Sequence, residues 1–83
     1  MKTIYKTTGT CSSAIEIELD GNGIIENVSF VGGCNGNTQG ISALVRGQKA
    51  QDVIARLKGI RCGMRRTSCP DQLAIALQQL VNE

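Results

Sequence analysis

The spacing of the hydrophobic positions changes about halfway along the chain. From residue 13 to residue 19, Ile15, Ile17 and Leu19 alternate with Glu16 and Glu18. A period of two is typical of a strand with one buried face. In the second half, apolar residues recur three and four positions apart, which is typical of helices that pack on one side. The pattern therefore predicts strands first and helices second.

Three strands are predicted in the first half. Residues 2–8 are rich in β-forming side chains and carry two lysines, which suit an edge strand. The alternating segment forms the second strand, and residues 24–31 form the third, with Val28 and Phe30 facing the core. Residues 20–23 read Asp-Gly-Asn-Gly, which predicts a hairpin turn because glycine and asparagine tolerate positive φ.

Three helices are predicted in the second half, over residues 39–46, 49–58 and 70–82. Asn37 or Thr38 is the expected N-cap of the first helix, and Gly47 and Gly59 end the first two. The residues expected to face inward are Ile41, Leu44, Val45, Ala50, Val53, Ile54, Leu57, Leu73, Ala76, Leu77 and Leu80. Strands followed by helices indicate one α+β domain over residues 1–83, with helices on one face of an antiparallel sheet.

The composition narrows the classes of function. A chain of 83 residues with 41% hydrophobic side chains folds around a modest core, so a metal or another cross-link would help it. A net charge of +2 does not indicate nucleic-acid binding by itself. The sequence has neither a membrane span nor the apolar stretch of a signal peptide. We therefore expect a cytoplasmic protein without a membrane partner.

The chain has four cysteines and no histidine. In a reducing compartment, such cysteines are typical of metal binding or redox chemistry rather than of structural disulfides. Hairpin geometry would bring Cys11 and Cys34 to the same end of the sheet, and Cys62 and Cys69 join them if the last loop folds over that end. Four thiolates are a known ligand set for zinc and for iron–sulfur clusters. Four inert cysteines are the alternative.

Three local features of the sequence each allow more than one interpretation. Cys69 directly precedes Pro70, so it is the predicted N-cap of the last helix, either as a plain cap or as a reactive thiol. Arg61, Arg65 and Arg66 indicate a solvated loop, a phosphate or nucleic-acid contact, or a means of keeping thiols ionised. The glycine-rich segment around Cys34 lacks the lysine and hydroxyl residue of a phosphate-binding P-loop, so it can be a simple turn.

The segment TSCPD at residues 67–71 resembles the TSCPD-domain family, and specifically its small four-cysteine branch. The resemblance covers essentially the whole chain, because it includes TGTCS, VGGCNGNTQGI, the GxxC at residues 59–62 and TSCPDQLA. A related domain occurs at the C-terminus of some adenosylcobalamin-dependent ribonucleotide reductases. The resemblance therefore implies an association with deoxynucleotide and DNA synthesis.

The chain is similar, more distantly, to the U-type iron–sulfur cluster scaffold proteins, which implies their α+β fold. The three ligand cysteines of the scaffold correspond to Cys11, Cys34 and Cys69. Two departures stand out: Ser12 and Ser13 replace the scaffold's aspartate, and Ser68 replaces its histidine. Cys62 is an added thiol. The resemblance thus implies a closed four-ligand site more than transient cluster assembly.

These observations lead to one main hypothesis and two alternatives. The main hypothesis is a structural or regulatory module, linked to ribonucleotide reduction, with a zinc or iron–sulfur site formed by Cys11, Cys34, Cys62 and Cys69. The first alternative is a dithiol of Cys62 and Cys69 that passes electrons to a reductase. The second, by family association only, is a nucleotide-binding protein with ribonucleoside-diphosphate reductase activity.

We predict no catalytic residue, because a chain of this length is too small for a radical-generating barrel. The expected partner is a ribonucleotide reductase or another protein, and a nucleotide remains an alternative ligand.

Overall fold

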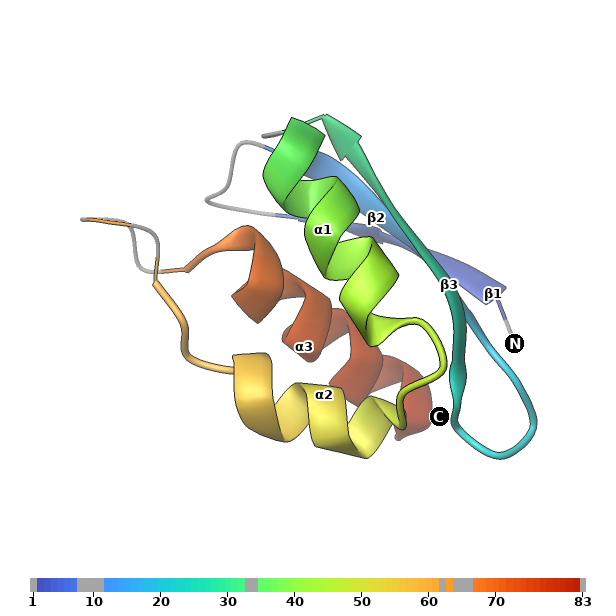
Figure 1. The fold of residues 1–83 in the computed structure, drawn as a ribbon. Coiled ribbons are helices and arrows are strands. Elements are labelled where there is room, and N and C mark those ends of the chain that lie inside the picture. Colours follow the sequence, from blue (N-terminus) through green and yellow to red (C-terminus); the bar gives the residue numbers. More distant parts are fainter. Residues whose placement is uncertain (1, 8–11, 33–34, 62, 64–66, 83) are drawn as a thin grey trace.

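A computed structural model describes residues 2–7, 12–32, 35–61, 63 and 67–82, with the side chains of residues 35–37 excepted. Its elements, in chain order, are β1 (Lys2–Lys6), β2 (Ser12–Leu19), β3 (Ile25–Gly32), α1 (Asn35–Val45), α2 (Ala50–Leu57) and α3 (Cys69–Val81). The strands form an antiparallel sheet in the order β1-β2-β3, and the three helices lie on the same side of it (Figure 1). The predicted α+β class is confirmed.

The alternation in β2 separates a buried face of the sheet from an outer face. Ile15 and Ile17 are almost fully buried, and Ile17 pairs with Thr3 on one side and Val28 on the other. On the outer face, Lys2 lies directly opposite Glu18, and such a pair of opposite charges favours this register. The predicted inward face of β2 is therefore confirmed.

Helix α3 supplies the largest part of the helical core. It packs against α2 and β2, and Leu73 and Leu77 are completely buried. Its buried apolar positions are Leu73, Ala74, Ala76, Leu77 and Leu80. The predicted inward residues of this helix are all confirmed, because a stripe at helical spacing leaves only one way to bury so much apolar surface.

Helix α1 departs from the prediction in two respects. It begins at Asn35, four residues before the predicted start at residue 39, so Thr38 lies inside the helix and is not its cap. Leu44 was expected to face inward, but 76% of it is exposed, whereas Val45 is buried. Among the described side chains of α1, Thr38, Ile41 and Val45 are turned inward. Packing against β3 sets this rotation and overrides the weak helix propensity of the Asn-Gly-Asn start.

The connection between α1 and α2 is fastened to β3. Gly47 ends α1 with φ of 84°, a conformation that favours glycine. Its N–H donates to the carbonyl of Ile25 over 2.8 Å, and the Ile25 N–H donates to the carbonyl of Gln48 over 2.9 Å. Ile24 and Lys49 form an antiparallel bridge beside them. Ile25, the first residue of β3, thus already has backbone hydrogen-bond partners on the side away from β2.

Candidate functional site

Of the four predicted site residues, the structure places Cys69. Cys11, Cys34 and Cys62 lie outside the described residues, so their predicted positions stay predictions. The described part of the chain contains no group of three or more histidine, cysteine, aspartate or glutamate side chains that could hold a metal ion. The described part of the candidate site therefore consists of Cys69 and of the residues next to the other three cysteines.

Cys69 is the first residue of α3 and is buried, with 7% of its surface exposed. Its Sγ lies 3.3 Å from the Oγ of Ser12, the first residue of β2, and either atom can act as the donor. Ser12 is itself buried. This contact joins the start of the last helix to one end of the sheet, across a separation of 57 residues in the sequence.

Ser68, and not Cys69, is the N-cap of α3, so the predicted cap was wrong by one residue. The backbone of Ser68 is extended, and its Oγ accepts the N–H of Asp71 over 3.1 Å. The same hydroxyl donates to the carbonyl of Ile60 over 2.6 Å. A serine oxygen accepts an amide hydrogen bond better than sulfur does, and serine is a preferred N-cap residue. The thiol of Cys69 is therefore left to face Ser12.

Asp71 is buried, and it holds the two ends of the last loop together. Its Oδ1 accepts the N–H of Gly59 over 2.6 Å, and its Oδ2 accepts a hydrogen bond from the Thr67 hydroxyl. Gln72 Nε2 adds a bond of 3.0 Å to Thr67 Oγ1. Together with the contact between Ser68 and Ile60, these bonds form what we call the loop clasp. In the TSCPD segment, the side chains of Thr67, Ser68 and Asp71 therefore fasten the loop and cap the helix. The side chain of Cys69 takes no part in the cap.

The sequence contains a signal for this cap that the prediction missed. Ser68 and Asp71 are three residues apart at the start of an apolar helix, which resembles the spacing of a capping box. In a capping box, the second side chain returns to the backbone of the N-cap residue. Asp71 instead reaches Gly59, twelve residues earlier. The spacing indicates the cap, but the loop partner depends on tertiary structure.

The described residues next to the cysteines converge at one end of the sheet. Ser12 follows Cys11 in the sequence, and it pairs in register with Gly32, two positions before Cys34. Ser12 also contacts Cys69, so this serine connects the sequence positions next to Cys11 and Cys34 with Cys69 itself. The segment around Cys62 belongs to the loop whose ends the clasp holds together.

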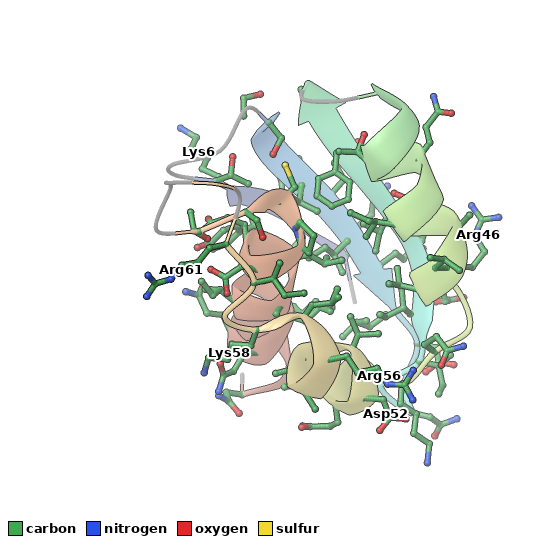
Figure 2. All side chains as sticks on the ribbon, turned by 60° about the vertical axis from the view of Figure 1, so that its left-hand side comes forward. Lys6, Arg46, Asp52, Arg56, Lys58 and Arg61 are labelled. Atoms are coloured by element: carbon green, nitrogen blue, oxygen red, sulfur yellow. The ribbon has the colours of Figure 1, made fainter. Side chains whose placement is uncertain are left out.

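The predicted basic cluster is only partly described. Arg61 is exposed and projects outward from the side of the molecule that also carries Lys6 and Lys58 (Figure 2). Arg65 and Arg66 lie outside the described residues. Arg46 projects from α1 on the opposite side of the molecule (Figure 2). The proposed roles of the three loop arginines therefore stay predictions.

A known protein family matches nearly the whole chain. The family model of the TSCPD domain matches residues 2–81. No curated protein and no solved structure matches significantly. Among the described residues, no helix is long and apolar enough to cross a membrane.

Proposed function

The chain belongs to the TSCPD domain family, and from that premise we propose that its four cysteines bind one zinc ion. The domain would serve as a structural or regulatory module linked to ribonucleotide reduction. An iron–sulfur cluster is the alternative occupant of the same ligands. The observation that carries the proposal is the contact between Cys69 and Ser12 at the end of the sheet where the chain continues to Cys11 and Cys34.

The chemistry of the described residues fits a metal bound by thiolates. A buried thiolate is costly unless a cation balances its charge, and Cys69 is buried at the first position of a helix. The Ser12 hydroxyl lies where it can donate a hydrogen bond to the sulfur. Hydrogen bonds of this kind orient ligand side chains and hold them in place. Four thiolates around zinc would make a closed site that adds to the stability of a small core.

The loop clasp also supports the proposed metal site, because it restrains the loop that contains Cys62. Asp71 and Ser68 fasten Gly59 and Ile60 beside the start of α3. Cys62 follows Ile60 by two residues, so the clasp limits how far this cysteine can lie from Cys69. A ligand held by a short, fastened loop loses less conformational entropy when it binds a metal.

Metal content tests the proposal directly. We expect the purified chain to contain about one equivalent of zinc and to be colourless. Changing any one of the four cysteines to serine should strip the metal and lower the thermal midpoint, because a three-thiolate site binds zinc more weakly. Elemental analysis and thermal unfolding of each variant provide the measurement.

Ser13→Ala is the matched control for these variants, because Ser13 is an exposed hydroxyl residue next to Ser12, and it should keep its zinc. A brown protein with iron and sulfide would identify the cluster instead. The metal proposal is wrong if all four single variants keep their metal and their stability.

A dithiol function is the second candidate, and the clasp is the observation that favours it. The 2.6 Å bond between Ser68 and Ile60 brings the sequence neighbours of Cys62 and Cys69 together. Oxidation of these two thiols to one disulfide would release two electrons and two protons to a reductase. This function predicts a metal-free protein in which one thiol reacts rapidly with iodoacetamide at neutral pH. The burial of Cys69 favours the metal site over this alternative.

A further inference from the structure

A groove with a volume of about 310 Å³ runs between β3 and α1, and Cys69 is not among the described residues that line it. Val28, Ser29 and Phe30 form its β3 side, and the face of α1 that carries Thr38 and Ser42 forms the other. We call it the edge groove. Three consecutive strand residues can line a groove only where the backbone edge of the strand faces it, because their side chains alternate between the two faces of the sheet.

The edge of β3 that faces the groove lacks a neighbouring strand within the described residues. The sheet order is β1-β2-β3, so β2 pairs with only one side of β3. The other side of β3 can also form backbone hydrogen bonds, because the N–H and carbonyl of Ile25 bond there to Gln48 and Gly47. The pairing with the α1–α2 connection ends near Ile25. Beyond it, no described segment pairs as a strand with residues 27–31 on that side.

The direction of the backbone groups in β3 follows from the side-chain faces. In a strand of given direction, residues on the same face point their N–H and carbonyl groups to the same side. Val28 and Phe30 share the inner face with Ile25, so their backbone groups point away from β2 as those of Ile25 do. Val31 lies on the other face, and its carbonyl accepts a bond from Ser13 of β2. Val28 and Phe30 therefore present backbone donors and acceptors to the groove.

Among the described residues that line the edge groove, Arg46 is the only one with a charged side chain. Its Nη2 donates to the Asn27 Oδ1 over 3.3 Å, which places the guanidinium near the first residues of β3. A strand added antiparallel to β3 would therefore end, with its C-terminus, beside Arg46. A guanidinium is well suited to bind a carboxylate, because it can donate two parallel hydrogen bonds.

From this geometry we propose that the edge groove binds the free C-terminal segment of a partner protein as a strand antiparallel to β3. Backbone hydrogen bonds to Val28 and Phe30 would align the segment, and Arg46 would bind its terminal carboxylate. Addition of a strand to an exposed sheet edge is a recurring mode of peptide recognition. This proposal does not depend on the metal site.

The first experiment uses the full chain, labelled with ¹⁵N, and a pool of acetylated hexapeptides with free C-termini, built from Val, Ile, Leu, Thr and Tyr. We expect the backbone amide signals of Val28 and Phe30 to shift on addition of the pool. A binder selected from it should lose about tenfold in affinity when its C-terminus is amidated, since one charge-assisted contact is lost. Two versions of the binder, each methylated at every second backbone nitrogen, should then differ. The version whose methylated nitrogens face β3 should not bind, whereas the version whose methylated nitrogens face away from β3 should bind.

Protein variants then test the named residues. Arg46→Gln should remove the tenfold preference for the free carboxylate, while Arg56→Gln, an exposed arginine on α2, should keep it. Ser42→Tyr should fill the groove and prevent binding without lowering the thermal midpoint. Equal affinity for the amidated peptide, or absence of shifts at Val28 and Phe30, would overturn the proposal. Self-association of the chain through β3, seen by sedimentation equilibrium, would overturn it in favour of a second copy as the occupant.

Discussion

Replacing Asp71 with alanine is expected to lower the free energy of unfolding by about 3 kcal/mol, since hydrogen bonds to a charged group are worth about 1.5–3 kcal/mol each. The carboxylate accepts bonds from the Gly59 N–H and the Thr67 hydroxyl, and alanine leaves both donors without this partner. Part of the loss is recovered because water can reach the exposed Gly59. A domain of this size has a total stability of about 4–12 kcal/mol, so the loss is a large fraction of it.

Asp52→Ala is the matched control for this variant. Asp52 and Asp71 are both the third residue of a helix, so both interact with the positive end of the helix dipole. Asp52 is exposed, whereas Asp71 is buried. We expect the control to lose about 0.5 kcal/mol or less. Urea unfolding followed by circular dichroism measures both variants.

Amide hydrogen exchange at Gly59 adds a local measurement to the Asp71 test. In the parent protein, the Gly59 N–H should be protected because Asp71 accepts its hydrogen bond. In Asp71→Ala, this amide should exchange faster, while amides in the middle of β2 change only as far as global stability falls. Equal stability of the two aspartate variants would show that Asp71 does not fasten the loop.

Truncation of Leu77 to alanine should cost about 3–4 kcal/mol, which is within the range measured for buried leucines. Leu77 is completely buried in the core between the helices and the sheet. The change removes buried methyl groups and leaves a cavity whose walls relax only partly, because protein interiors are densely packed. Chemical unfolding at equilibrium measures the loss, and the slope of the transition should stay the same.

Leu44→Ala provides the same chemical change at an exposed position. Leu44 is 76% exposed on α1, so its truncation should change the free energy of unfolding by less than about 0.5 kcal/mol. The comparison tests the rotation of α1 as well as the core, because the sequence pattern predicts Leu44 to face inward. A loss above about 2 kcal/mol in Leu44→Ala would place this side chain in a core contact.

The sequence was sufficient to predict the elements whose pattern is local. The alternation of Ile15, Ile17 and Leu19 predicted β2 and its buried face, and the spacing of Leu73, Leu77 and Leu80 predicted α3. Such patterns are reliable because burial of one face is possible only at the period of the element. The same reasoning was less successful for α1, because few apolar residues mark its first turns and packing against β3 sets its rotation.

For the candidate site too, the sequence indicated some features and the tertiary structure was needed for others. The TSCPD segment by itself indicated the family and the helix start, and the family is confirmed over residues 2–81. The metal ligands that the sequence suggests stay a prediction.

Only the tertiary structure placed the Cys69 thiol against Ser12 and the Asp71 carboxylate on Gly59. These contacts join segments 57 and 12 residues apart. Hydrophobic periodicity gives no information on such pairs, because their formation depends on how β2, the last loop and α3 meet in space.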